Sequence, residues 1–443
     1  MQVMNDTIFA PSTAIGGAIA VIRISGPESD TVARTLLQKR LSPRRMTYAL
    51  LQDGSETLDA CMAVWFPAPY SYTGEDMLEL HCHGGIQTFR RVSEALLALH
   101  LRPAEGGEFT KRAFLNGKMD LTQAEAVMDV INAQADASLK SALHQLGGGV
   151  GRQIASIEDQ LLNIRSVIEA AIDYPDEMEE EVTDRLPLQL NAILQKIEIL
   201  LEHAQHGRFL REGIRVVILG KPNVGKSSLF NALLGEDRAI VTGIAGTTRD
   251  VLDERVTWNG VSVRLLDTAG LREAADEAES IGIDRARQAL KYADLLLIVL
   301  DGSNPLSEED QKLLFETAEL NRLIVLNKCD RTIAKETVTY CKQQNINGMK
   351  ISCKSGEGIQ ALRERIISIA EPERMDTTCI TNLRHIRALE RARSSILQAK
   401  VQTDLDCIGT ELREASHQLG TITGTDVDEK LLDRIFENFC VGK

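Results

Sequence analysis

The chain has 443 residues, 43% of them hydrophobic, which is more than one hydrophobic core usually supports, so we expect a multidomain globular protein. A formal net charge of −14 argues against a broad basic surface that binds nucleic acid through its phosphates, so any RNA binding should be local or shared with a partner. Apolar runs such as 295–300 are too short to cross a bilayer and the amino terminus lacks a secretory signal pattern, so we expect a cytoplasmic protein.

Residues 1–118 alternate short apolar, strand-like runs with helical patterns, which predicts a compact α/β domain. The strand-like runs are 18–24, 61–66 and 77–81, and the helical patterns lie near 28–37 and 86–99. His81, Cys82 and His83 are residue types that bind metals. Alternation along a strand puts the two histidines on one face and the cysteine on the other, so we interpret them as strand packing.

From Asp120 the apolar residues recur at three and four positions, which indicates amphipathic helices. Asp120 and Gln123 are spaced like a capping box, and Tyr174-Pro175 should end the helix over about 153–172. We expect the acidic run 176–181 to be a solvated loop. The segment 148–151 has the spacing of a KH-type G-x-x-G loop but lacks basic neighbours, so we interpret it as a turn between helices.

Strands return at 215–219 and alternate with helices until about 370, after which helical spacing resumes. We infer that the helical segments on both sides form one domain, into which the α/β segment is inserted. The predicted domains are an amino-terminal domain over 1–118, a discontinuous helical domain over 119–212 plus 372–443, and an inserted domain over 213–371.

A phosphate-loop sequence occupies 220–227, between a strand over 216–219 and a helix over 228–234. Its glycines let backbone amides converge on phosphates, Lys226 reaches the β and γ oxygens, and Ser227 offers a hydroxyl to Mg²⁺. Asp267-Thr268-Ala269-Gly270 ends the next strand, where a carboxylate belongs near the metal and an amide near the γ-phosphate.

The motif Asn327-Lys328-Cys329-Asp330 selects guanine, because the Asp330 carboxylate can accept from both N1–H and the exocyclic amine. Ser352-Cys353-Lys354 adds backbone contacts to the base. These motifs follow strands in the order of translation-factor-like GTPases, so the inserted domain is predicted to be a doubly wound P-loop GTPase domain. The residues predicted to bind GTP are Asn223, Val224, Gly225, Lys226, Ser227, Ser228, Thr242, Gly243, Ile244, Ala245, Gly246, Thr247, Thr248, Asp267, Thr268, Ala269, Gly270, Asn327, Lys328, Asp330, Ser352, Cys353 and Lys354.

The segment 242–250 is rich in glycine and threonine and should be a nucleotide-sensing switch, with Thr248 as the second Mg²⁺ hydroxyl. Leu271 stands where signalling GTPases of this class use a glutamine to orient water. The residues alone do not choose among the acids of 272–279 for that role.

Taken with the carboxyl-terminal Phe439-Cys440-Val441-Gly442-Lys443, the whole chain resembles the MnmE (TrmE) family of tRNA modification GTPases, within the TrmE-Era-EngA-like class. The resemblance implies that K⁺ replaces an arginine finger and assigns its ligands to Asn223, Thr242, Ile244 and Thr247. It assigns the orientation of the hydrolytic water to Glu279. It also implies a homodimer held by the amino-terminal domains, with G domains that associate across the K⁺ face.

The resemblance further implies that the amino-terminal domain binds tetrahydrofolate, with 5-formyl- or methylene-tetrahydrofolate as one-carbon donor. It assigns ligand contacts to Arg23, Glu79, Lys118 and Lys443, and places Cys440 near the folate site of the opposite subunit. A thiol near a cation has enhanced thiolate character and could act in the chemistry. The alternative for Cys440 is a packed, inert cysteine.

The predicted function is GTP hydrolysis that drives addition of aminomethyl or carboxymethylaminomethyl groups to C5 of the wobble uridine of certain tRNAs. The resemblance supplies the partner, the flavoprotein MnmG, which carries FAD and would contribute most of the tRNA-binding surface. Two alternatives remain open. A ribosome-assembly GTPase would bind ribosomal subunits and leave wobble modification intact on deletion, and a free-standing folate-dependent methyltransferase would modify tRNA without the flavoprotein.

Overall fold

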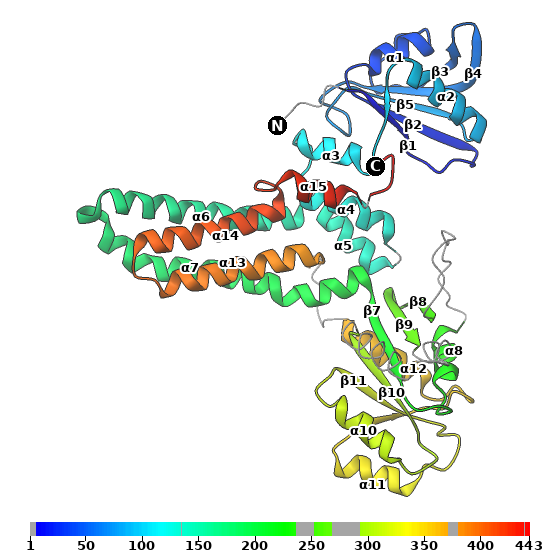
Figure 1. Ribbon diagram of the computed structural model, residues 1–443, viewed down its shortest axis with the longest axis vertical. Coiled ribbons are helices and arrows are strands. Elements are labelled where there is room, and N and C mark those ends of the chain that lie inside the picture. Colours follow the sequence, from blue (N-terminus) through cyan, green and yellow to red (C-terminus); the bar gives the residue numbers. More distant parts are fainter. Residues whose placement is uncertain (1–5, 134, 236–251, 268–292, 371–379, 438) are drawn as a thin grey trace, which may run out of the picture. The chain divides into compact units, whose positions relative to one another are not determined.

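The computed structural model describes residues 6–133, 135–235, 252–267, 293–370, 380–437 and 439–443 (Figure 1). The chain forms two compact units. One comprises Met1–Ile131, His144–Leu194 and Ala388–Lys443, and the other comprises Asn132–Leu143 and Gln195–Arg387. The second unit contains the whole of the predicted inserted segment 213–371.

The first unit contains a six-stranded sheet in the order β3-β4-β5-β2-β1-β6. Its strands are β1 (Ile8–Pro11), β2 (Ile19–Ser25), β3 (Thr47–Asp53), β4 (Glu56–Phe66), β5 (Met77–His83) and β6 (Arg102–Pro103). All neighbours are antiparallel except β1 and β6, which are parallel. The register of β2 and β5 sets Arg23 directly opposite Glu79.

Helices α1 (Ser29–Leu36) and α2 (Ile86–Ala98) bury their apolar faces in the core of this sheet, as the predicted runs require. Along β5 the predicted alternation is confirmed, since Cys82 is 2% exposed whereas His83 is exposed and pairs with Asp59 at 2.7 Å. Strands β1, β3 and β6 were not predicted. β1 and β6 are only four and two residues long, too short to show a period.

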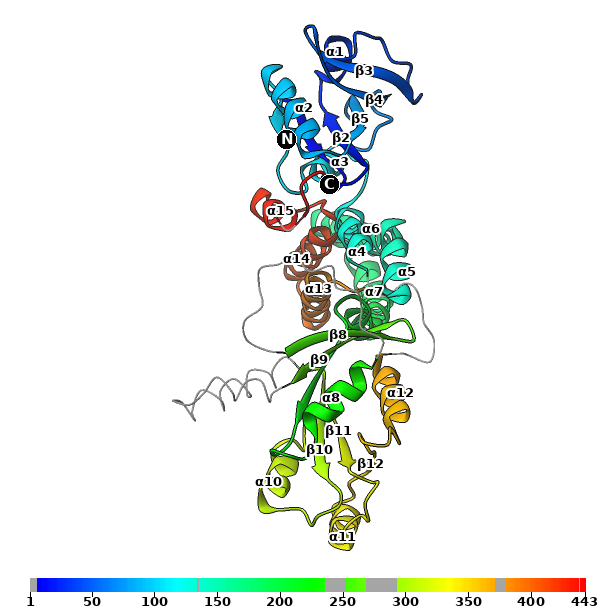
Figure 2. The ribbon, with the colours of Figure 1, turned by 90° about the vertical axis from the view of Figure 1, so that its right-hand side faces the viewer.

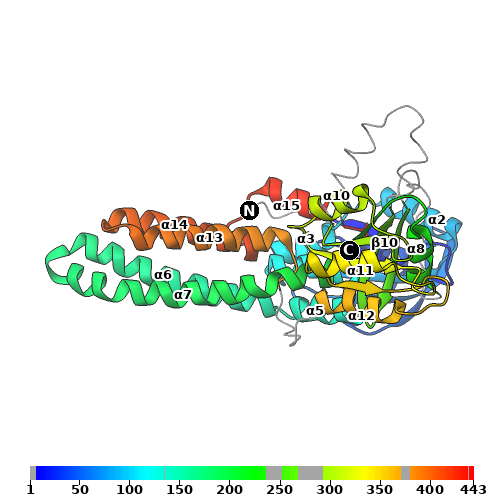
Figure 3. The same ribbon diagram turned by 90° about the horizontal axis from the view of Figure 1, so that it is seen from below.

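The remaining helices before and after the second sheet are α3 (Glu108–Leu115), α4 (Leu121–Asn132), α5 (Asp136–Leu146), α6 (Gly149–Asp173), α7 (Pro175–Glu212), α13 (Leu383–Val401), α14 (Leu405–Thr423) and α15 (Glu429–Phe436). Within the first unit α6 packs against α14, so segments far apart in sequence share one helical layer (Figure 3). The predicted capping box is confirmed at the start of α4. The Asp120 amide donates to Gln123 Oε1 at 3.0 Å, and the Gln123 amide donates to Asp120 Oδ1 at 2.9 Å.

The expected loop over 176–181 is wrong, because α7 begins at Pro175 and runs through it. Proline suits the first position of a helix, and acidic residues in the first turn interact favourably with the helix dipole. Of the other two local predictions, one is confirmed and one is confirmed in part. Helix α6 ends at Asp173, as predicted, but the turn predicted over 148–151 holds only for Gly148, with φ of 77°, because α6 begins at Gly149.

The second unit contains a six-stranded sheet in the order β12-β11-β10-β7-β9-β8 (Figure 2). Its strands are β7 (Ile214–Leu219), β8 (Leu252–Trp258), β9 (Val261–Asp267), β10 (Leu295–Asp301), β11 (Arg322–Asn327) and β12 (Gly348–Lys350), and only β8 runs antiparallel to its neighbour. Helices α8 (Lys226–Leu234) and α12 (Ile359–Ala370) cover one face, and α10 (Glu308–Glu316) and α11 (Lys335–Gln343) cover the other. This is the doubly wound arrangement that the sequence predicts.

Candidate nucleotide site

The phosphate-loop sequence lies where the pattern requires, between the end of β7 and the start of α8. Three of its residues have positive φ: Gly220 at 153°, Asn223 at 65° and Gly225 at 100°. A Cβ on Gly225 would lie 2.3 Å from Asn327 Nδ2, and one on Gly220 would lie 2.4 Å from the Val299 carbonyl oxygen. Glycine is required at both positions for conformation and for space.

Side chains hold three carbonyl groups of this loop. Asn327 Nδ2 donates to the Val224 carbonyl at 2.9 Å, and Lys328 Nζ donates to the Asn223 carbonyl at 3.0 Å. Lys226 Nζ donates to the Lys221 carbonyl at 2.7 Å. Because the N–H of a peptide group points opposite to its carbonyl, the bonds to the Asn223 and Val224 carbonyls fix the directions of the Val224 and Gly225 amides at the start of α8, where anions bind. The peptide group of the Lys221 carbonyl has no N–H, because the next residue is Pro222.

The base-recognition residues follow β11 and β12. Ser352 Oγ donates to Asp330 Oδ1 at 2.7 Å, and this bond lowers the pKa of the exposed Asp330 carboxyl below its ordinary value, against a smaller desolvation effect. The Cys353 amide donates to Asn327 Oδ1 at 3.2 Å, so Asn327 joins the base loop to the phosphate loop. Burial raises the pKa of the Cys353 thiol to about 11, which keeps it protonated at neutral pH.

Two residues with clear roles in this network escaped the sequence predictions. Asp301 ends β10, and its Oδ2 accepts from Lys328 Nζ at 2.7 Å. Burial raises the pKa of Asp301, but hydrogen bonds from Lys328 and Ser303 outweigh it and hold the pKa below its ordinary value. The signal was available, because Asp301, like Asp267, is a carboxylate at the end of an apolar strand. The other residue is Lys221, whose side chain contacts α10.

Several predicted residues lie outside the described part of the chain: Thr242, Gly243, Ile244, Ala245, Gly246, Thr247, Thr248, Thr268, Ala269, Gly270 and Glu279. Asp267 is described as the last residue of β9. Ser227 and Ser228 lie in the first turn of α8, and Lys354 follows Cys353 on the base loop.

In the first unit, Arg23 and Glu79 meet across neighbouring strands, with Arg23 Nη2 3.0 Å from Glu79 Oε1. The guanidinium lies over the rings of Tyr72 and Phe109, at 5.2 and 5.7 Å from their centroids. Neither aromatic residue was predicted, because single aromatic residues in a loop and a helix carry no local pattern. Lys118 Nζ donates to the Pro69 carbonyl at 2.8 Å.

The carboxyl-terminal tail contacts the amino-terminal domain of its own chain. The Gly107 amide donates to the Cys440 carbonyl at 3.3 Å, Gly106 pairs with Val441 in an isolated bridge, and Ser12 Oγ donates to the Gly442 carbonyl at 3.3 Å. Cys440 is exposed, and the Lys443 amide donates to its carbonyl at 3.4 Å. The assignment of Cys440 to a folate site of the opposite subunit stays a prediction.

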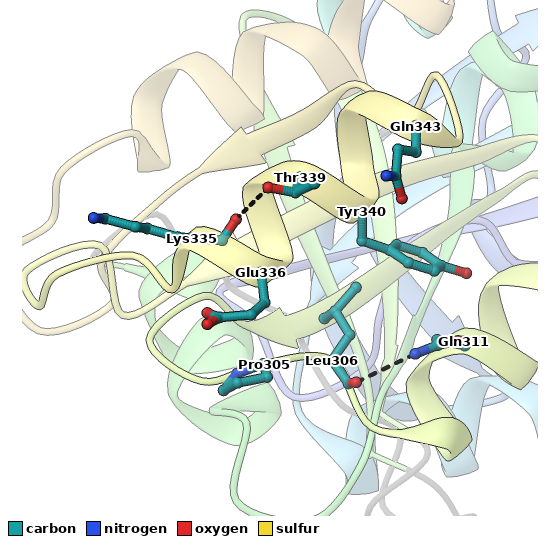
Figure 4. A pocket seen from close by; sticks show the side chains of 8 residues that line it. All are labelled: Pro305, Leu306, Gln311, Lys335, Glu336, Thr339, Tyr340 and Gln343. Atoms are coloured by element: carbon teal, nitrogen blue, oxygen red, sulfur yellow. Dashed lines mark hydrogen bonds between the residues drawn. The ribbon is translucent and has the colours of Figure 1, made fainter.

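A pocket of about 430 Å³ lies between α10 and α11 and contains none of the predicted GTP-binding residues (Figure 4). Leu306 and Tyr340 contribute its apolar wall and also pack against the core of that face. Its lining residues are Pro305, Leu306, Gln311, Lys335, Glu336, Thr339, Tyr340 and Gln343. The nucleotide site is therefore defined by the loops after β7, β10 and β11 and not by this hollow.

Comparison with known proteins identifies the family. The description "GTP-binding protein TrmE N-terminus" matches residues 7–118, and "MnmE helical domain" matches residues 121–440. A relative from Akkermansia muciniphila, a "tRNA modification GTPase MnmE", is 45% identical over 99% of this chain and 99% of its own length. The chain belongs to the MnmE family of tRNA modification GTPases.

Other MnmE relatives extend the match over full length, including one from Alkaliphilus metalliredigens that is 42% identical over 99% of this chain and 100% of its own. The relatives are GTPases, and this chain has the guanine-recognition motif that such an enzyme needs. The chain is therefore a GTP hydrolase of the MnmE family. Among solved structures, the G domain of the T. maritima FeoB iron transporter is 29% identical and covers 36% of this chain, at a TM-score of 0.27 that is too low for a structural conclusion. In the described ranges, none of the helices is long and apolar enough to cross a membrane.

Proposed function

We propose that this chain is a potassium-activated GTPase that acts with the flavoprotein MnmG to install aminomethyl or carboxymethylaminomethyl groups at C5 of the wobble uridine of certain tRNAs. The match to MnmE relatives over 99% of the chain carries this proposal, because it includes both the GTPase motifs and the amino-terminal domain. The proposed organisation is an amino-terminal domain over 1–118, a helical domain over 119–212 plus 372–443, and a G domain over 213–371.

The phosphate loop has a suitable geometry for triphosphate binding. Its amides converge at the start of α8, whose dipole favours anions, and Lys226 and Ser227 are the first residues of the helix. Ser227 and Thr248 are the proposed hydroxyl ligands of Mg²⁺, which would offset phosphate charge when bound. Asp330 and the base loop select guanine over adenine.

The residues proposed for K⁺ are Asn223, Thr242, Ile244 and Thr247, of which only Asn223 lies in the described ranges. Asn223 fits the role, because it lies in the phosphate loop with an exposed side chain that carries an amide oxygen. Amide, hydroxyl and carbonyl oxygens suit a large monovalent ion, which would offset charge developing between the β and γ phosphates.

The first test compares the GTPase rate of the pure protein in K⁺ and in Na⁺ at equal ionic strength. We expect the rate to fall at least about tenfold in Na⁺, because losing one preorganised hydrogen-bond donor to transition-state charge already lowers rates by about 10²–10³. Asn223→Ala should lower the K⁺ rate and abolish the difference between the ions. Equal rates in both salts for the unmodified protein would reject the K⁺ mechanism.

Glu279 is the proposed group that orients the hydrolytic water, since Leu271 has no polar atom for that purpose. Glu279→Ala should abolish hydrolysis and leave GTP affinity within about twofold, because orienting water acts on the transition state and not on the bound ground state. Single-turnover hydrolysis and nucleotide titration separate the two quantities. Glu277→Ala, which removes a nearby acid of the same kind, is the matched control and should behave like the unmodified protein.

The proposed folate contacts are Arg23, Glu79, Lys118 and Lys443. A carboxylate suits a pterin, whose ring N–H and amine form a donor pair, and the partly exposed Tyr72 offers a flat wall beside Arg23. Methylene- or 5-formyl-tetrahydrofolate would supply the one-carbon unit. Cys440 is the residue of the tail whose thiol is proposed to act in the chemistry.

A homodimer through the amino-terminal domains is part of the proposal. Strand β3 lies at the edge of its sheet and exposes Tyr48 and Leu50, with Met46 exposed just before it. An exposed apolar edge strand is a surface suited to association. The acidic charge of −14 fits a division of labour in which MnmG supplies most of the contacts to tRNA.

A further inference from the structure

The side chain of Lys221, the second residue of the phosphate loop, joins the loop to the start of α10. Its Nζ lies 2.7 Å from Asp310 Oδ2 and 2.5 Å from Ser307 Oγ. The Lys221 side chain is 28% exposed and that of Asp310 is 6% exposed, so the ion pair is largely shielded from solvent. Removing one partner of a shielded pair costs more than removing one partner of a surface pair, because the charge that remains is poorly solvated.

The start of α10 is rigid at the point of contact. Ser307 and Asp310 form a capping box, in which the Ser307 amide donates to Asp310 Oδ2 at 3.0 Å and the Asp310 amide donates to Ser307 Oγ at 3.3 Å. Leu314 of the same helix is buried in the core under that face of the sheet. The Lys221 ammonium is therefore attached to a fixed helix end and not to a mobile surface chain.

The backbone of Lys221 makes a second connection. Its carbonyl accepts the hydrogen bond from Lys226 Nζ at 2.7 Å. One residue thus binds α10 through its side chain and the phosphate-binding lysine through its backbone. Asn223 and Val224 are held from the other side by Lys328 and Asn327, so the loop is fixed at both ends of its turn.

We propose that Lys221 is a positioning residue for GTP binding, which Ser307 and Asp310 hold so that the first turn of the phosphate loop and the direction of Lys226 are set before nucleotide arrives. This inference rests on the proposed GTPase function. Freeing Lys221 would let residues 221–222 move and would displace the acceptor of Lys226, which would weaken phosphate binding by loss of preorganisation.

The test uses the full-length protein and a fluorescent GTP analogue. Lys221→Met removes the ammonium and keeps most of the stem, Asp310→Asn removes the countercharge, and Lys221→Arg keeps a cation. Lys312→Met is the matched control, because Lys312 lies on the same helix and is 75% exposed. Each variant is measured for dissociation constant, binding stoichiometry and single-turnover hydrolysis.

We expect Lys221→Met and Asp310→Asn each to raise the dissociation constant about tenfold, within the range of coupling seen between contacting residues. The double variant should be no weaker than either single variant, because the two side chains act through one bond. Lys221→Arg and Lys312→Met should bind within about twofold of the unmodified protein, on the scale of changes that leave such an interaction in place. Stoichiometry should stay unchanged in all variants.

An unchanged dissociation constant for Lys221→Met would overturn the proposal. So would a reduced stoichiometry at unchanged affinity, because that pattern means partial misfolding and a purely structural ion pair. A failure of the unmodified protein to bind GTP is a different result, which would reject the proposed GTPase function itself and the positioning role with it.

Discussion

Asp330 shows how one side chain can decide the choice of base. Its carboxylate is held by Ser352 Oγ at 2.7 Å and stands on the loop after β11. Asp330→Asn should weaken GTP binding about a hundredfold, because an amide cannot accept from both guanine donors and each charge-assisted bond contributes about 1.5–3 kcal/mol. The variant should gain affinity for xanthosine triphosphate, whose carbonyl at the same position accepts from the new amide. Competition titrations measure both nucleotides, and Asp330→Asn with undiminished GTP affinity would contradict the role.

The lowered pKa of Asp330 also fixes the pH dependence of that binding. A carboxyl whose pKa lies below its ordinary value loses its charge only as the pH falls through that lower value. Asp330 therefore stays ionised across the neutral and mildly acidic range, and guanine selection should not weaken there.

Some residues of the nucleotide site could be predicted from the sequence, and others could not. Asn327 and Asp330 follow an apolar strand in a fixed motif, so their place at the end of β11 could be predicted. The contact between Lys221 and Asp310 could not, because the two residues are far apart in the chain and no local pattern joins the phosphate loop to the start of α10. Distance in the fold, unlike spacing in a motif, depends on which helix covers which face of the sheet.

At the scale of elements, a buried guanidinium attaches α3 to the residue Asp6 before β1 and to the loop between β4 and β5. Arg112 is 1% exposed and contacts Glu108 at 3.0 Å, Asp6 at 2.8 Å and Glu75 at 3.2 Å. Arg112→Met should destabilise the amino-terminal domain by about 1.5–3 kcal/mol, because it removes charge-assisted hydrogen bonds of a buried guanidinium, whereas Arg102 still pairs with Asp6 and Glu108. Urea unfolding followed by Trp65 fluorescence, in a Trp258→Phe background, measures the change.

The pH dependence of this loss has a definite sign. Burial raises the pKa values of Asp6 and Glu108, but hydrogen bonds led by those from Arg102 outweigh it, so both lie below their ordinary 3.8 and 4.5. Their stabilisation is present at neutral pH and is lost as the pH falls below those values. The difference between Arg112→Met and the unmodified protein should therefore stay constant from pH 7 to about pH 5 and narrow only below about pH 4. Arg90→Met, which breaks an exposed pair with Glu94, should change stability by less than about 1 kcal/mol at any pH.

The prediction of helices and strands succeeded where a regular apolar spacing extended over many residues. It failed where a run of acidic residues was interpreted as a loop. The residues Ile154, Ile157, Leu161, Ile164 and Ile168 are all buried along α6, as their spacing predicts. The acidic run after Pro175 is helical, because glutamate is a good helix former and a negative first turn is favourable. A strand as short as β6 exists because it pairs with β1, and two residues of sequence do not reveal that partner.

At the scale of the whole molecule, features that depend on local motifs could be predicted, whereas features that depend on contacts between distant residues could not. The motifs predict a doubly wound sheet and its nucleotide loops, because each motif depends on one strand and the turn after it. The position of the tail depends on contacts between residues 106–107 and 440–441, which are far apart in the chain, and only the folded structure gives it.

Variants of the carboxyl-terminal tail should separate the two proposed activities, GTP hydrolysis and tRNA modification. Gly442 has φ of 93°, and a Cβ there would lie 2.0 Å from the Pro11 carbonyl oxygen. Gly442→Ala should displace the tail without altering the Cys440 thiol, whereas Cys440→Ser keeps the tail in place and removes the thiol. We expect both variants to retain the GTPase rate and to lower wobble-uridine modification with MnmG at least about tenfold, because the tail contacts the proposed folate-binding domain and not the phosphate loop. Val441→Ala is the control, since its exposed side chain leaves the backbone bridge to Gly106 intact. If both variants modified tRNA normally, the tail would have no part in the reaction. If only Cys440→Ser did so, the tail would act through its position and not through its thiol.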